Sequence, residues 1–470
     1  MRDVGDLAVV LHSHMPYVEG FGTYPFGEEW LFDAFARSHL PVLAAAHDVT
    51  VTVTPVLADQ LEAPGVGERM RAFLERHRLG AAERDAAEAA SELRDAAGAE
   101  VDRYRGALEA LEELGGNGVE AFAAPAREGR IELIPSAATH AVLPLLATEA
   151  GQRLQLDAGL RSHRRRFGWR GGFWLPECAY APGLGLGRVL AERGVTHTCL
   201  DQSPRRGPLD PQNPIRIGEG GPVGFSLDWP SVELVWSQRG YPSDPAYAEF
   251  HRLSINGTRL WAIGGPPLDP GAADARARAH GAEFAAAVAE RLERFRAEHG
   301  RRGLVTFAID TELLGHWWSE GPVWLEAMLG AAPEAGLRLR TLSSALAEHE
   351  PVQRPVRASS WGEGNDLRTW SSPAVADLAW GARRLELRLL RAIGEGLERP
   401  AAERAARELL AVQSSDWAFL DARRTAGDYP FRRATGHAQR LLEAVDFTST
   451  PEPRLRNLAP DLSLVPLLEP

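Results

Sequence analysis

Lysine is absent from the 470 residues of this chain, so every fixed positive side chain is an arginine. This excludes a Schiff-base lysine and the lysine of a Walker A loop, and with them pyridoxal phosphate enzymes and P-loop nucleotidases. No Gly-x-Gly-x-x-Gly sequence opens a helix after a strand, so a dinucleotide site is not indicated. The two cysteines, Cys178 and Cys199, are too few for a disulfide scaffold and suit a reducing compartment.

Basic tracts and long apolar runs are missing as well. The net charge of −12 and the lack of a basic tract argue against a surface that binds nucleic-acid phosphates and displaces their counterions. We therefore expect a neutral or cationic substrate and no nucleic-acid partner. The first apolar run, residues 7–11, is too short for a signal-peptide core or a membrane span. A cytoplasmic protein with no membrane partner is the expectation.

Strand and helix patterns alternate over most of the chain. Apolar or β-branched runs at residues 6–13 and 49–57 flank a segment of helical spacing, which predicts a parallel sheet. Together with the strand patterns that follow, they indicate an irregular (β/α) barrel of seven or eight strands. The later patterns cover residues 131–136, 172–177, 195–201, 223–228, 259–263, 304–310 and 337–341.

Three stretches depart from this alternation. Residues 66–128 are rich in Ala, Glu and Arg, which predicts a helical insertion beside the barrel mouth. Residues 203–224 are rich in Pro, Gly and Arg and are predicted to form a loop over the mouth. From about residue 355 to about residue 447 only helical patterns occur. We therefore expect a catalytic barrel domain over residues 1–354 and an all-α domain over residues 355–470.

Glu177 follows an apolar run that stops at Pro176, with Trp174 and Tyr180 on either side. In a parallel barrel, a carboxylate at the end of a strand lies at the mouth where active sites form. The two aromatic residues suit the faces of sugar rings. The alternative is a helix N-terminus, with Pro176 in the first turn and Glu177 stabilising the helix dipole. From this stretch alone the two interpretations have equal weight.

Asp310 ends a second apolar strand, residues 304–310, and histidine and tryptophan follow it. Two carboxylates at the mouths of two strands can face each other across a glycoside. One then attacks the anomeric carbon and the other, kept protonated, gives a proton to the leaving oxygen. The alternative is that Asp310 caps a helix that begins near Glu312.

His12 and His14 stand two residues apart at the end of the first strand, which places both side chains on the same face. Metal-dependent amidohydrolases bind metal ions with such a histidine pair and an aspartate at the end of their last strand. Asp310 could be that aspartate and His140 a further ligand, so a mononuclear metal site is the main alternative hypothesis. A bridging carboxylated lysine cannot form in this chain. We favour the histidines as hydrogen-bonding partners of sugar hydroxyls and expect no metal. Taken alone, each histidine fits better as a buried core residue that is hydrogen-bonded to a polar group.

Several of the thirteen tryptophans stand in polar contexts, although a buried tryptophan is the default. Trp361 lies in a turn-like stretch without an apolar face, and Trp317 follows the second acidic strand end. Asp416 and Trp417 interrupt a helical pattern. These residues suit a binding site for an extended polyol, and Asp416 equally suits a helix N-cap.

The chain resembles glycoside hydrolase family 57 and, within it, the α-1,4-glucan branching enzymes. The motifs that carry this resemblance span nearly the whole chain in the order of the family; they are residues 12–17, 28–32, 54–57, 136–140, 172–180, 235–237, 240–245, 310–321, 359–362 and 413–417.

The resemblance implies a (β/α)7 barrel with a helical insertion and a helical C-terminal domain. It also implies a retaining mechanism without a metal or organic cofactor, acting on an α-glucan polysaccharide or maltooligosaccharide. Glu177 matches the nucleophile and Asp310 the proton donor. Trp361 and Asp416 match substrate-contacting positions, and His12 matches a histidine near the cleaved bond.

The sequence departs from the branching pattern in its loops. Residues 203–224 are shorter than usual and lack a tyrosine-bearing stretch that shields the covalent intermediate from water. Residues 247–261 are abbreviated, and Thr425 stands where a glutamine is usual. Branching is the first prediction, and a mainly hydrolytic α-amylase is the close alternative. A glucan-binding protein without activity is a remoter one, against which both retained carboxylates argue.

Overall fold

The computed structural model describes residues 3–20, 26–202, 213–446 and 452–469. Its centre is a parallel sheet in the strand order β3-β2-β1-β7, in which β8 also pairs with the first half of β1. β1 and β2 are buried on both faces, which explains their continuous apolar and β-branched sequences. The strands are β1 (Gly5–Ser13), β2 (Val49–Val53), β3 (Ile131–Ile134), β7 (Leu304–Asp310) and β8 (Leu337–Arg340).

Irregular segments close this sheet into a barrel. The Trp174 N–H donates to the Pro135 carbonyl at 2.7 Å, and the Phe173 N–H donates to the His197 carbonyl at 3.0 Å. Residues 172–175 thereby join β3 to β4 (His197–Leu200). β4 pairs with β6 (Val223–Ser226), and the Asp228 N–H after β6 donates to Thr306 of β7 at 2.9 Å. The predicted irregular (β/α)7 barrel with a helical C-terminal region is confirmed.

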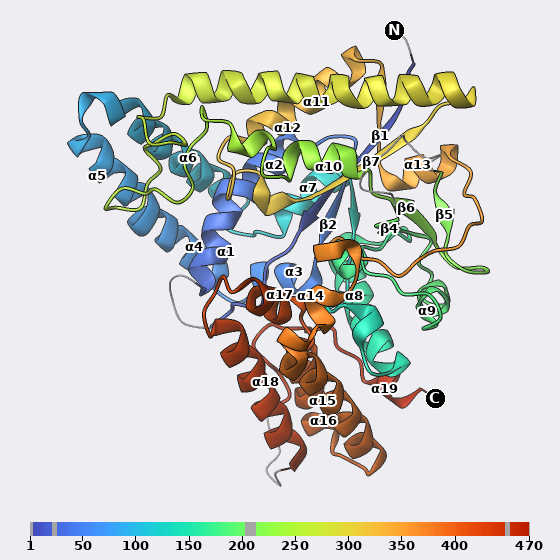
Figure 1. Cartoon of the computed structure of the whole chain (residues 1–470). Coiled ribbons are helices and arrows are strands. Elements are labelled where there is room, and N and C mark those ends of the chain that lie inside the picture. The colour runs from blue at the N-terminus through green and yellow to red at the C-terminus, as the bar shows by residue number, and fades with distance from the viewer. Residues whose placement is uncertain (1–2, 21–25, 203–212, 447–451, 470) are drawn as a thin grey trace.

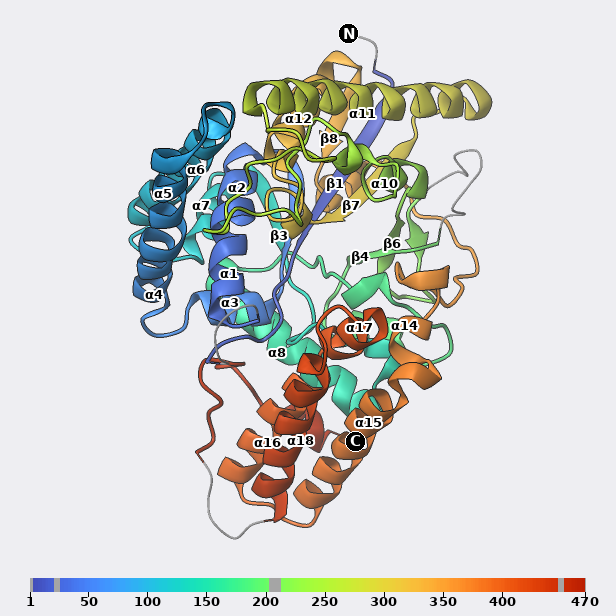
Figure 2. The same ribbon diagram turned by 60° about the vertical axis from the view of Figure 1, so that its left-hand side comes forward.

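Helices surround the barrel (Figure 1). The long helix α11 crosses one end, and α4, α5 and α6 stand to one side as the predicted helical insertion (Figures 1 and 2). The helices up to residue 348 are α1 (Glu28–Ala34), α2 (Leu40–Ala45), α3 (Pro55–Leu61), α4 (Val66–Phe73), α5 (Gly80–Glu88), α6 (Arg94–Glu113), α7 (Glu120–Arg127), α8 (Glu149–Phe167), α9 (Leu186–Glu192), α10 (Trp229–Val235), α11 (Pro270–His299), α12 (Gly321–Glu334) and α13 (Leu342–Glu348).

The C-terminal helices pack side by side below the barrel, with α15, α16 and α18 roughly parallel in both views (Figures 1 and 2). Their amphipathic faces share a core built from leucines and alanines, including Leu389, Leu409 and Leu441. The helices are α14 (Arg368–Ser371), α15 (Ala376–Gly394), α16 (Arg399–Val412), α17 (Ser415–Arg423), α18 (Tyr429–Asp446) and α19 (Val465–Leu468).

Three local predictions were wrong. Residues 172–177 form only isolated bridges at Gly172 and Trp174, followed by the 3₁₀ helix Pro176–Cys178, rather than a strand. Residues 259–263 form only isolated bridges at Trp261 and Ala262 rather than a strand, because Gly264 and Gly265 turn the chain at once. Within the predicted loop 203–224, residues 213–224 contain β5 (Ile215–Arg216) and the start of β6, while residues 203–212 lie outside the described part. The predicted domain boundary at residues 354/355 stays a prediction. No helix among the described residues is long and apolar enough to cross a membrane.

Candidate active site

The carboxyl ends of the parallel strands bring the predicted residues to one place. His12 at the end of β1 stands opposite Asp310 at the end of β7 in the strand register, so their side chains share a face. His140 follows β3, and Glu177 follows the bridging segment 172–175. Because the strands are parallel, these chain positions meet at the same end of the barrel, where catalytic residues of such barrels lie.

Glu177 is held in an unusual backbone conformation. It has φ 60° and Cys178 has φ 49°, a region that non-glycine residues rarely adopt. The Trp361 N–H donates to the Glu177 carbonyl at 3.0 Å, and the Trp361 indole Nε1–H donates to Glu177 Oε2 at 2.7 Å. The carboxylate is thus held by another segment and does not cap its own short 3₁₀ helix, Pro176–Cys178. Strain of this kind concentrates at functional sites.

Ser415 links Glu177 to a histidine. Its hydroxyl lies 2.9 Å from His140 Nδ1 and close enough to the Glu177 carboxylate to lower the pKa of that group. The same ring nitrogen is 3.5 Å from Glu177 Oε1. His140 Nε2 is buried and has no hydrogen-bond partner among the described residues, and the same holds for both ring nitrogens of His12. Buried groups of this kind are expected to be satisfied by something else, such as a ligand hydroxyl or water.

His14 is oriented from three sides. Its Nε2 lies 2.9 Å from Asp416 Oδ1, and its Nδ1 lies 3.1 Å from Thr54 Oγ1. Its backbone N–H donates to Glu312 Oε1 at 2.9 Å. Asp416 therefore orients a histidine of the site rather than capping α17. The carboxylates of Asp416 and Glu312 outweigh burial and raise the pKa of His14.

Aromatic rings form the floor of the site. The His12 ring stacks on Trp174 at 4.6 Å and on His140 at 4.8 Å between centroids. His14 stacks on His140 at 4.3 Å, and Trp361 meets Trp174 edge-on at 5.1 Å. Burial and the charge of His14 lower the pKa values of His12 and His140 well below the usual histidine value.

Asp310 is the exposed last residue of the otherwise buried β7. Its side chain does not hydrogen-bond the N–H groups of the 3₁₀ helix Thr311–Leu313 in the described structure, so the capping alternative is not supported. Protein nevertheless surrounds the carboxyl group closely. Desolvation, together with the charges of Glu312 and Glu177, raises the pKa of Asp310 to about 8.

The two carboxyl groups differ in their preference for a proton. Burial raises the pKa of Glu177 to about 7, although hydrogen bonds from Trp361 and Ser415 counteract it. Asp310 has the higher pKa because it lacks these stabilising donors and feels the charge of Glu177. Near neutral pH the pair therefore favours an ionised Glu177 beside a protonated Asp310, which is the division of labour of a nucleophile and an acid.

Two predicted residues lie outside this group of contacts. Trp417 is only 1% exposed, and its indole N–H donates to the Ala411 carbonyl at 2.7 Å, so it packs as a core residue. Trp317 is half exposed on the loop that follows Asp310. Sequence reasoning missed Ser415, Thr54 and Glu312 as parts of the site. The sequence signal that could have indicated these three residues was their position inside or beside the recognised motifs.

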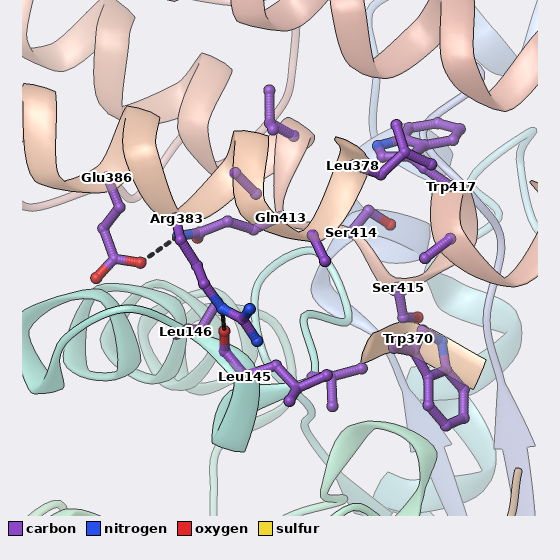
Figure 3. Close-up of a pocket in the computed structure, with 15 residues that line it drawn as sticks. Leu145, Leu146, Trp370, Leu378, Arg383, Glu386, Gln413, Ser414, Ser415 and Trp417 are labelled. Atoms are coloured by element: carbon purple, nitrogen blue, oxygen red, sulfur yellow. Dashed lines mark hydrogen bonds between the residues drawn. The ribbon is translucent and has the colours of Figure 1, made fainter. Parts of the chain in front are cut away.

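A pocket of about 60 Å³ lies next to Ser414 and Ser415, between α15, α17 and the chain after β3 (Figure 3). Trp370 and Trp417 contribute to its wall. Glu386 accepts a hydrogen bond from Gln413 at 3.0 Å there. Glu177 and Asp310 do not line this pocket in the described structure.

The metal-site alternative finds no support in the geometry. Among the described residues, no three His, Cys, Asp or Glu side chains are placed to hold a metal ion. Both ring nitrogens of His14 are already engaged by Asp416 and Thr54.

Two family models match this chain. Residues 8–231 match the model of glycosyl hydrolase family 57, and residues 383–461 match the model of the 1,4-alpha-glucan branching enzyme C-terminal region. The first match contains Glu177 and the histidines of the site. The second covers the helices from α15 to α18, including the segment with Ser415 and Asp416.

Relatives cover nearly the whole chain. A probable 1,4-alpha-glucan branching enzyme of Mycobacterium tuberculosis is 33% identical, over 93% of this chain and 91% of its own length. The crystal structure of a GH57-type branching enzyme from Pyrococcus horikoshii superposes with a TM-score of 0.89 at 28% identity, covering 99% of this chain and 97% of that one. The α-amylase AmyC from Thermotoga maritima superposes with a TM-score of 0.81 at 26% identity, covering 95% and 93%. On this evidence, the chain belongs to glycosyl hydrolase family 57.

Proposed function

We propose that this protein is a retaining 1,4-α-glucan branching enzyme, which cleaves α-1,4 links and transfers the released chain to a 6-hydroxyl. The observation that carries the proposal is the coupled pair Glu177 and Asp310 at the barrel mouth, with its unequal pKa values. The named function of the relatives and the match to the branching-enzyme C-terminal model support the choice of reaction. The site needs no cofactor for this chemistry.

The first step forms a covalent intermediate. An oxygen of the Glu177 carboxylate attacks C1 of a glucosyl unit, and the C1–O4 bond breaks. Asp310 gives its proton to the departing O4, which leaves as the hydroxyl of the shortened chain. Trp361 and Ser415 hold the attacking carboxylate in place during this step, while the unpartnered nitrogens of His12 and His140 are available to sugar hydroxyls.

The second step releases the glucosyl group. The ionised Asp310 takes the proton from a 6-hydroxyl of the acceptor, the acceptor oxygen attacks C1, and Glu177 departs as a carboxylate. Two inversions at C1 retain the α configuration. A sugar acceptor prevails over water only when its hydroxyl is held in line and water is kept away.

A mainly hydrolytic α-amylase remains the second candidate. It uses the same two residues and differs only in the acceptor, which is water. The specific observation in its favour is the close superposition with the α-amylase AmyC. The alternative of a glucan-binding protein without activity is disfavoured because the site retains both carboxyl groups and their pKa values differ.

The reaction has a distinctive product pattern. With amylose as substrate, new reducing ends should appear mainly after debranching, because each transfer consumes the end that cleavage creates. Glu177→Gln should abolish both cleavage and transfer while keeping affinity for the glucan. Reducing ends that accumulate at once would identify the amylase instead. Undiminished activity in the Glu177→Gln variant would remove Glu177 from the mechanism.

The activity should depend on pH as a bell. Raising the pH through the pKa of Glu177, about 7, ionises the nucleophile and increases kcat/KM. Raising it further through the pKa of Asp310, about 8, removes the acid and decreases kcat/KM. The two limbs report the coupled pair rather than isolated groups. Initial rates between pH 5 and 10, with stability checked by returning samples to neutral pH, test this, and a level profile contradicts it.

Ser415 should act by positioning and by stabilising the charge of Glu177. Ser415→Ala removes one hydrogen bond to the carboxylate, so the acid limb of kcat/KM should move to higher pH by about one unit. The alkaline limb, which reports Asp310, should stay in place, and Ser415→Thr should restore the original profile. A uniform loss of rate with unmoved limbs would indicate a purely structural contribution.

A further inference from the structure

An exposed tryptophan on the loop after Asp310 packs against a half-buried phenylalanine from another segment. The Trp317 side chain is 46% exposed, and its ring lies 4.5 Å from that of Phe250, at an angle of 34°. The rings come from separate segments, the turn after β7 and the abbreviated stretch 247–261. An exposed tryptophan packed against a second ring offers a flat apolar surface of the kind that sugar rings cover.

Buried charges fix this pair. The Arg259 guanidinium lies 5.0 Å from the centroid of the Phe250 ring and hydrogen-bonds the His316 carbonyl. Arg259 is itself buried. His316 approaches the carboxylate of Asp33 in α1, which in turn pairs with Arg78 of the helical insertion at 2.8 Å. The surface is therefore preformed, because the residues behind it connect the loop after β7 to the helical insertion.

The loop that carries Trp317 is also tied to the catalytic residues. The Trp317 N–H donates to the Glu312 carbonyl at 3.2 Å, and the Glu312 carboxylate holds the His14 backbone. A side chain at position 315 would not fit, since a Cβ on Gly315 would lie 1.9 Å from the Arg37 carbonyl oxygen. Trp317 thus has a defined place on the loop that follows Asp310, whereas Trp361 holds Glu177.

The side of the site determines which chain such a surface can hold. The acid–base group touches the leaving oxygen in the first step and the acceptor oxygen in the second, so the acceptor reaches C1 from the side of Asp310. A surface on that loop is placed to bind the incoming glucan and to keep its hydroxyl in line against the competition of water.

We infer that Trp317 and Phe250 form a binding surface for the acceptor glucan chain and set the division between transfer and hydrolysis. This inference rests on the proposed function and extends it to a specificity-determining pair of residues. The chemical class of the ligand is an α-glucan segment that stacks the apolar face of a glucosyl ring on the indole.

The test compares transfer with hydrolysis in Trp317→Ala. With amylose, the fraction of cleavages that end in hydrolysis should rise about fivefold to tenfold, as expected for the loss of one stacking contact. Added maltooligosaccharide acceptor at high concentration should restore transfer by mass action. Total cleavage should fall as well, because the leaving segment of the donor occupies the same side in the first step, so the readout is the ratio of hydrolysis to transfer. Phe250→Leu should shift the same ratio less.

Two matched variants make the outcome decisive. Trp317→Phe keeps a ring and should retain most of the transfer, and Trp380→Ala, which removes a tryptophan of similar exposure (59%) from α15, should leave the ratio unchanged. An unchanged ratio in Trp317→Ala, or a raised ratio that excess acceptor does not lower, would overturn the inference. Failure of the proposed function looks different, since the wild-type protein itself would then form no branches.

Discussion

The burial of two carboxyl groups, Glu177 and Asp310, at the end of the barrel strands is the constraint on which this molecule depends. Desolvation raises both pKa values, and the charges of Glu312 and Glu177 raise that of Asp310 further. Two hydrogen-bond donors then favour charge on Glu177. The proton therefore favours Asp310, which fits the roles of nucleophile for Glu177 and acid for Asp310 in the proposed mechanism.

The site is assembled from distant parts of the chain. Barrel strand ends supply the carboxyl groups and the stacked histidines, whereas the residues that orient them come from residues 359–361 and 413–416. Trp361 fixes Glu177, Ser415 joins Glu177 to His140, and Asp416 orients His14. The helical C-terminal region therefore contributes residues to the candidate site in addition to packing against the barrel, and the predicted boundary at residues 354/355 runs between parts that both contribute to it.

The strand ends could be predicted from sequence because an apolar run that stops at a carboxylate is visible in one dimension. Glu177 and Asp310 were proposed in this way, and the alternation of elements predicted the barrel. The pairing of Ser415 with His140 depends on contacts across 275 positions, which no local pattern encodes. Trp417 shows the converse, since its polar neighbours suggested binding while its ring packs in the core. The strand predicted at residues 259–263 failed because adjacent glycines end it.

Trapping the covalent intermediate tests the central claim most directly. A 5-fluoro-α-maltosyl fluoride should react with the enzyme and slow the second step enough for peptide mass spectrometry. Trypsin cleaves after Arg170 and Arg188, and Glu177 is the one acidic residue between them. We predict one maltosyl adduct on that peptide and products of retained α configuration. An adduct on the peptide that carries Asp310, or products of inverted configuration, would contradict the account.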